Sequence, residues 1–128
     1  MTAVAGLPWG LDDVVEPLAN ADRAALIESS QLFVGVKEFA PGEVFANHYH
    51  EGYDEFFAGL SGSLTLWTGR AQRVELTEGT SLLCRRGIHH YIVNETGEPA
   101  RVLFAKVPLI TDDTTWVDWS PQSLPSQG

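Results

Sequence analysis

The distribution of apolar residues between Gln31 and Pro108 constrains the fold most strongly. They occur in short runs rich in Val, Phe, Tyr and Leu, separated by Gly, Pro, Asn or acidic residues. Runs of this kind are typical of β-strands joined by turns, and they leave little room for helices. They predict eight strands, which are Leu32–Phe39, Val44–His50, Glu55–Gly59, Ser63–Thr68, Gln72–Leu76, Ser81–Cys84, His89–Val93 and Arg101–Val107.

So many short strands predict an all-β fold in which antiparallel hairpins close into a small barrel or jelly roll. A chain of 128 residues fits one domain. We expect a barrel core at about residues 31–108, an N-terminal arm at 1–30 and a C-terminal tail at 109–128, with its last residues disordered. Residues 19–27 fit either a short helix or an edge strand, and their periodicity does not decide.

Charge and composition narrow the possible partners. Seventeen acidic residues against eight basic ones give a net charge of −9, which disfavours nucleic acid and anionic membranes as partners. The chain shows no apolar run of about 20 residues and no signal-peptide pattern at its start, which predicts a cytoplasmic protein that does not enter a membrane. The single cysteine, Cys84, is interpreted as a small buried apolar residue rather than a nucleophile.

The four histidines form two short clusters, His48 with His50 and His89 with His90. Residues two apart on a strand point to one face, so the first pair projects together, and Glu55 on the next strand can face the same interior. Two imidazoles and a carboxylate on one face are part of a metal site. The adjacent His89 and His90 face opposite sides, so only one can join the site without a bulge, and geometry alone does not choose between them.

These residues lie in two spaced motifs. The first is Gly42-x5-His48-x-His50-x4-Glu55-x6-Gly62, which resembles the first motif of the cupin superfamily position for position. The second cupin motif, G-x5-P-x-G-x2-H-x3-N, is matched by Gly79, Gly87, His90 and Asn94, with Arg85 in place of the usual proline. The resemblance covers about Leu32 to Val107.

The resemblance implies a cupin-type antiparallel β-barrel, also called a double-stranded β-helix. It selects His90 over His89 and implies one divalent metal held by His48, His50, Glu55 and His90. Imidazole and carboxylate donors suit Zn, Fe, Mn, Ni or Cu, and an octahedral ion keeps positions open for water or substrate. Arg85 replaces a turn residue rather than a ligand.

Five further residues are candidates for contact with a substrate. Tyr53 shares the strand parity of Glu55 and is a candidate proton donor, and His89 is interpreted as an outward-facing or supporting residue with a possible catalytic role. Phe57 is expected to line the cavity. Lys37 and Lys106, the only lysines, would meet an anionic substrate if they faced inward, although a solvated strand face is the default.

The preferred hypothesis is a metal-dependent enzyme with a small organic substrate, the metal acting as Lewis acid or activating dioxygen. Dioxygenase, isomerase and polyketide-cyclase chemistry all fit. Few basic residues occupy predicted inward positions, which favours a weakly charged, aromatic or polyketide-like substrate. The alternative is a non-catalytic binding or sensing module. We also expect a homodimer, with Trp116 and Trp119 anchoring the C-terminus to the barrel or to the second subunit.

Overall fold

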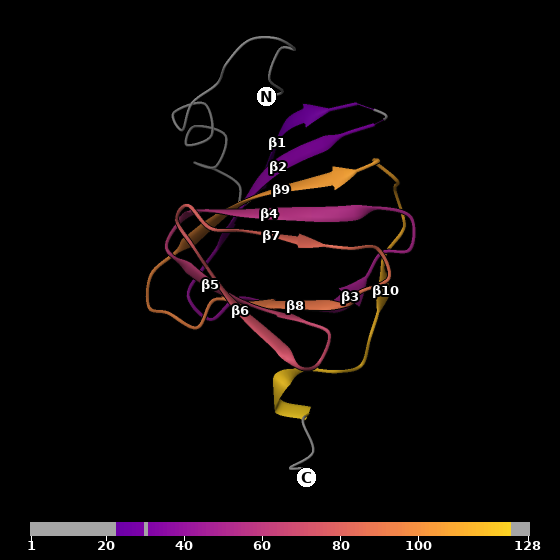
Figure 1. The fold of residues 1–128 in the computed structure, drawn as a ribbon. Coiled ribbons are helices and arrows are strands. Elements are labelled where there is room, and N and C mark those ends of the chain that lie inside the picture. The colour runs from indigo at the N-terminus through magenta and orange to yellow at the C-terminus, as the bar shows by residue number, and fades with distance from the viewer. Residues whose placement is uncertain (1–22, 30, 124–128) are drawn as a thin grey trace.

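The computed structural model describes residues 23–29 and 31–123, which form two antiparallel sheets packed face to face (Figure 1). The first sheet has the order β1-β2-β9-β4-β7 and the second the order β10-β3-β8-β5-β6. The first sheet is built from β1 (Arg23–Glu28), β2 (Phe33–Phe39), β9 (Ala100–Val107), β4 (Asp54–Ser61) and β7 (Ser81–Cys84). The second contains β10 (Thr115–Trp116), β3 (Val44–Tyr49), β8 (His90–Val93), β5 (Ser63–Thr68) and β6 (Gln72–Thr77).

The main core lies between the sheets and follows the alternation of the strands. Its buried members include Phe39, Phe57, Leu66, Ile92 and Phe104, so both sheets contribute their inward rows. A second apolar cluster, built around Val34 and Val36, comes from the residues of opposite parity on the first sheet. The strands of this sheet therefore carry apolar residues on both faces, and only the inward-facing residues belong to the main core.

A β-bulge in β3 changes which of its residues face inward. Phe45 pairs with Ile92 and His48 with His90, so a step of three residues on β3 matches a step of two on β8. Simple alternation would put Phe45 and His48 on opposite faces. The extra residue of the bulge brings both side chains to the same cavity.

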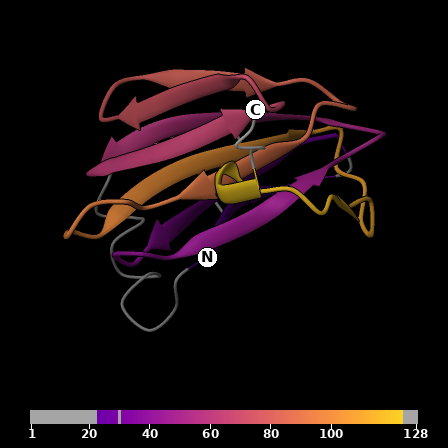
Figure 2. The ribbon, with the colours of Figure 1, turned by 90° about the horizontal axis from the view of Figure 1, so that it is seen from below.

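The chain between β9 and the C-terminal turn returns across the second sheet. Its strand β10 pairs with β3, and the following η1 (Pro121–Ser123) lies over the outer face of that sheet (Figure 2). The buried Trp119 packs there against Trp67, His89 and Tyr91. The prediction that Trp119 anchors this segment to the barrel agrees with these contacts.

The structure confirms the predicted all-β, cupin-type architecture and locates all eight predicted strands with small shifts of their ends. His89 precedes β8 instead of beginning it. Of the two alternatives for residues 19–27, the described part forms an edge strand, β1, paired with β2. Residues 19–22 and the predicted disordered end, 124–128, lie outside the described residues. No helix within the described ranges is long and apolar enough to cross a membrane.

Candidate metal centre

Four buried side chains converge between the two sheets. His48 lies on β3, and His50 directly follows the end of that strand. Glu55 lies in the inner row of β4, and His90 begins β8. One nitrogen or oxygen from each lies within 4.8 Å of the others. We call these four residues the donor cluster.

Neighbouring backbone groups fix the orientation of the first two imidazoles. Nδ1 of His48 lies 2.8 Å from the carbonyl oxygen of Ala46, and Nδ1 of His50 lies 2.7 Å from that of Asp113. A carbonyl oxygen can only accept, so each Nδ1 carries a proton and each Nε2 is directed to the cluster. Carbonyl acceptors in this position are typical of metal-binding histidines.

His90 is oriented by a thiol instead. Its Nδ1 lies 3.2 Å from Sγ of Cys84, and that sulfur lies 3.4 Å from the carbonyl oxygen of Ile88. The arrangement that satisfies all three groups has Nδ1–H donating to sulfur and the thiol donating to the carbonyl. Burial, together with the nearby Glu55 and Asp54 charges, raises the pKa of Cys84 to about 12, so the thiol stays protonated. Nε2 of His90 then carries no proton, and its lone pair is available to a metal.

The electrostatics keep the cluster ready to bind a cation. Burial and the charge of His90 lower the pKa of His48 to about 4, so this imidazole is neutral at pH 7. Burial by itself raises the pKa of Glu55, but the neighbouring imidazoles of His50 and His90 favour its charged form and lower the pKa to about 2. An ionised carboxylate therefore lies beside a neutral imidazole, and these are the protonation states that a metal requires.

A buried atom without a hydrogen-bond partner tests whether the cluster fits a metal. Nε2 of His90 is fully buried and forms no hydrogen bond with acceptable geometry, while Nε2 of His50 lies 3.0 Å from Oε1 of Glu55. Bonds of about 2.1 Å place opposite donors about 4.2 Å apart. The four donor atoms, all within 4.8 Å of one another, are already gathered near this limit, and an ion between them would give the lone Nε2 its missing partner.

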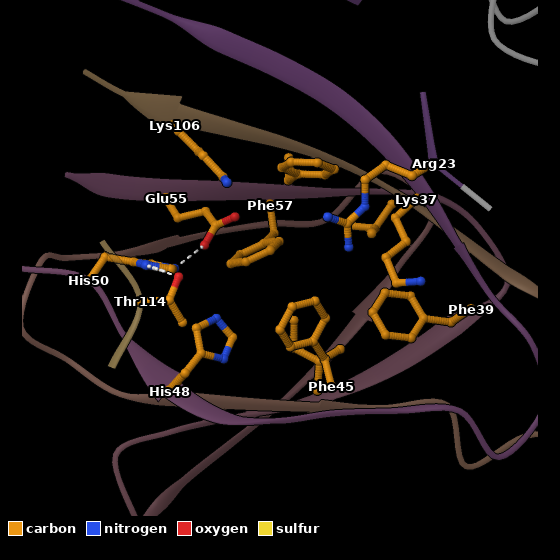
Figure 3. Close-up of a pocket in the computed structure, with 13 residues that line it drawn as sticks. Arg23, Lys37, Phe39, Phe45, His48, His50, Glu55, Phe57, Lys106 and Thr114 are labelled. Carbon is orange, nitrogen blue, oxygen red and sulfur yellow. Dashed lines mark hydrogen bonds and ion pairs between the residues drawn. The ribbon is translucent and has the colours of Figure 1, made fainter. Parts of the chain in front are cut away.

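Three members of the donor cluster, His48, His50 and Glu55, form one wall of a cavity of about 600 Å³, a volume that includes the open mouth (Figure 3). Aromatic rings of Phe39, Phe45, Phe57 and Phe104 form the apolar walls. Three cationic side chains, Arg23, Lys37 and Lys106, complete the lining. A cavity with apolar walls and a few convergent polar groups is the usual form of a small-molecule site.

Both lysines and Phe57 line this cavity, so the default assignment of the lysines to a solvated strand face is wrong. Lys37 is buried and its ammonium lies 2.8 Å from Glu43. The ammonium of Lys106 lies 5.5 Å from the ring centroid of Tyr53. The premise that few basic residues face inward is therefore incorrect, and the preference for a weakly charged substrate loses its support.

Tyr53 and His89 do not line the cavity. Tyr53 is buried and stacks on His50 with ring centroids 4.2 Å apart, so it supports that ligand candidate and does not form the rim. Burial raises the pKa of Tyr53. His89 lies on the outer face of the second sheet, where its Nδ1 is 3.0 Å from Oδ1 of Asn47 and its ring packs on Trp119. The geometry supports neither residue as a group that touches substrate.

Several site residues escaped the sequence analysis, and three of them show why. Phe45 has the wrong parity and enters only through the bulge, and Arg23 lies in the segment that was left undecided. Asp113 lies in the predicted C-terminal tail, yet its carboxylate accepts hydrogen bonds from Glu51 N and Gly52 N at 3.2 and 2.7 Å while its carbonyl oxygen accepts one from His50 Nδ1. No local pattern marks an acidic residue 63 positions from its partner.

Comparison with known proteins agrees with this architecture. The family model described as Cupin domain matches residues 35–106, which is more than half of the chain. Over 94 residues the chain is 38% identical to the tetracenomycin polyketide synthase protein TcmJ of Streptomyces glaucescens. That match spans 70% of this chain but only 62% of the length of TcmJ.

Solved structures show the same fold at low sequence identity. The polyketide cyclase RemF of Streptomyces resistomycificus superimposes with a TM-score of 0.67 and 22% identity, covering 77% of this chain and 73% of RemF. A protein of Bacillus halodurans superimposes with a TM-score of 0.73 and 20% identity, covering 91% and 92% of the two chains. At such identities these likenesses establish the fold and not the reaction.

Proposed function

This chain belongs to the cupin family, and from that premise we propose that it is a metal-dependent enzyme whose donor cluster binds one divalent transition metal. The observation that carries the proposal is the buried Nε2 of His90, which has no hydrogen-bond partner among the described residues and lies 3.5 Å from Oε1 of the ionised Glu55, beside two further imidazoles. The donors suit Zn, Fe, Mn, Ni or Cu. When bound, such an ion supplies Lewis acidity or, if it is iron, dioxygen activation.

The protein's own residues bind and orient the substrate. The aromatic walls exclude water from the reacting groups and favour an unsaturated or aromatic body. Lys106 is paired in register with Glu55, on the same inward row, so its ammonium lies beside the donor cluster. It is positioned to donate a hydrogen bond to a substrate oxygen that gains negative charge.

We further propose ring closure of a polyketide-like substrate as the reaction. Such a step removes a proton from carbon, forms a carbon–carbon bond to a carbonyl carbon and returns a proton to the carbonyl oxygen. The support is the 38% identity to TcmJ and the structural likeness to the cyclase RemF. The water-poor, aromatic-lined cavity suits a reactive enol that must be kept from side reactions.

The rival proposal, a binding or sensing module, requires that no proton donor reach the reacting groups. Tyr53 and His89 fit that requirement, but Lys106 does not, because it lines the cavity in the same row as Glu55. The decisive experiment assays purified, metal-loaded protein against a panel of linear polyketide mimics with chromatographic detection of cyclised products. Elemental analysis of untagged protein identifies the ion. Turnover that disappears on chelation supports the enzyme, whereas tight binding of the mimics without turnover supports the binding module.

Removing the sulfur beside His90 is expected to weaken metal binding. In Cys84→Ala, the imidazole Nδ1 keeps only the carbonyl of Ile88, at 3.5 Å, as an acceptor. Loss of a group that orients a ligand lowers metal affinity about 10-fold or more. Competition with a chromophoric zinc chelator measures the change. Cys84→Ser, which keeps an acceptor and donor, should recover much of the affinity; equal affinities for all three proteins would contradict the role of Cys84.

The homodimer remains a prediction. Its physical basis is the open sheet edges, which among the described strands are β1 and β7 in the first sheet and β10 and β6 in the second. Trp116 on β10 is also 61% exposed and is a large apolar side chain for a protein surface. The mass of one chain is 14.0 kDa, and light scattering at micromolar concentration should give twice that mass if the dimer forms. A monomeric mass would overturn this prediction.

A further inference from the structure

We infer that the cavity selects an elongated aromatic anion, with one oxygen-bearing end at the donor cluster and a second acidic group at the opposite end, beside Arg23. This inference rests on the proposed function, because it assigns a substrate class to the same site. The neutral or weakly charged substrate favoured by the sequence does not match the groups that line the cavity.

Two of the cations that line the cavity are without an anionic partner among the described residues. Within residues 23–29 and 31–123, neither Arg23 nor Lys106 forms an ion pair, whereas Lys37 is paired with Glu43 at 2.8 Å. Both unpaired cations lie against the same ring, with Arg23 Cζ at 5.7 Å and Lys106 Nζ at 6.0 Å from the centroid of Phe104. A cation held beside apolar rings and without a counter-ion attracts an anionic ligand.

The strand register orders these groups into three inward rows. The rows contain Glu55 beside Lys106, then Phe57 beside Phe104, then Arg23 beside Lys37. On β9 the first row lies at Lys106 and the third at Val102, which is paired with Lys37. Four residues of strand span about 13 Å. The cavity therefore has a donor end and a cationic end separated by an aromatic floor, as Figure 3 shows.

The charge distribution of the chain makes this placement significant. The chain has eight basic residues and a net charge of −9, yet three of the eight line this one cavity. Glu55 is the only carboxylate among the lining residues, and it belongs to the donor cluster. A divalent ion there would offset Glu55 and leave the cavity strongly cationic. An acidic substrate would be attracted to this site in spite of the overall negative charge.

The test uses three naphthalenes of equal size as probes. Naphthalene-2,6-dicarboxylate carries an acid at each end, 6-carbamoyl-2-naphthoate carries one, and naphthalene-2,6-dicarboxamide carries none. Titration calorimetry on zinc-loaded protein should show the dicarboxylate binding at least about tenfold tighter than the monoacid, and the monoacid tighter than the diamide. Equal dissociation constants for the dicarboxylate and the diamide would overturn the inference.

Matched arginine variants locate the second acidic group. Arg23→Gln should lower the affinity for the dicarboxylate to about that for the monoacid, with little effect on the diamide. Arg73→Gln is the control, because Arg73 lies on β6, is half exposed and pairs with Glu95. Circular dichroism confirms that both variants fold. If the two variants bind the dicarboxylate equally well, Arg23 does not contact the ligand and the inference is wrong.

Zinc titration of the same proteins separates this inference from the proposed function. Protein that binds zinc but does not distinguish acids from amides retains the proposed metal site and loses the anion selectivity. Protein that prefers the dicarboxylate, with the Arg23 dependence, but binds no metal retains the selectivity and loses the metal-dependent function.

Discussion

Replacing His90 with alanine is expected to lower zinc affinity by at least about 100-fold. Loss of a group that merely orients a ligand costs about 10- to 100-fold, and loss of a ligand costs more. His90 also supplies the buried Nε2 that lacks a hydrogen-bond partner among the described residues. The variant therefore removes a ligand atom whose burial only an ion would compensate. Competition with a chromophoric chelator, together with elemental analysis, measures the loss.

The adjacent histidine is the matched control. His89 precedes His90 in the chain but lies on the outer face of the second sheet, against Asn47 and Trp119. His89→Ala should leave zinc affinity unchanged within about twofold, which is the precision of such competition measurements. If His89→Ala and His90→Ala lose zinc equally, the assignment of the inward histidine is wrong, and the donor cluster is not the metal site.

Replacing Asn94 with alanine is expected to cost about 3 kcal/mol or more in the free energy of unfolding. Its side chain is 0% exposed and donates to the carbonyl oxygens of Phe39 and Glu98 at 3.0 and 2.8 Å. Its Oδ1 accepts from the backbone N and the hydroxyl of Thr96 at 2.9 and 2.8 Å. Each buried group left without a partner costs about 1–3 kcal/mol. Urea denaturation with linear extrapolation measures the difference.

A second buried asparagine provides the comparison. Asn47 is as buried as Asn94, but its Oδ1 contacts only His89 and its Nδ2 has no partner among the described residues. Asn47→Ala removes an unsatisfied donor along with one hydrogen bond, so we expect a cost of about 1 kcal/mol or less. Equal losses in the two variants would show that volume, and not the hydrogen bonds of Asn94, determines stability at these positions.

The sequence was sufficient to predict the strands and the residues of the donor cluster. Strand alternation puts His48 and His50 on one face, and the spaced glycines mark turns that need a positive φ, as Gly42 and Gly87 have in the structure. Gly87 N donates to the carbonyl oxygen of His50 at 2.7 Å, which joins the second motif to the first. These features depend on short-range patterns that are visible in a single sequence, whereas the choice of His90 over His89 depends on the resemblance to cupins.

The remaining site features depend on long-range contacts that no local pattern reveals. A bulge reverses the parity of Phe45 relative to His48, and alternation cannot predict where a strand gains a residue. The side of the sheet on which Lys37 and Lys106 lie depends on the register of β2 and β9, which are far apart in the chain. Arg23 enters the cavity only because β1 pairs with β2 as an edge strand.

The positions of Arg23 and of the Asp113 loop that holds His50 affect how the substrate preference of this protein can change. The segment that matches the cupin family, residues 35–106, contains the whole donor cluster, whereas Arg23 and Asp113 lie outside it. A substitution at Arg23 would change one end of the cavity, and one at Asp113 would change how firmly the His50 imidazole is held, without replacing any of the four donors. A lineage could therefore adjust these two contacts separately from the donor atoms, although the lysines and the aromatic walls stay within the matched segment.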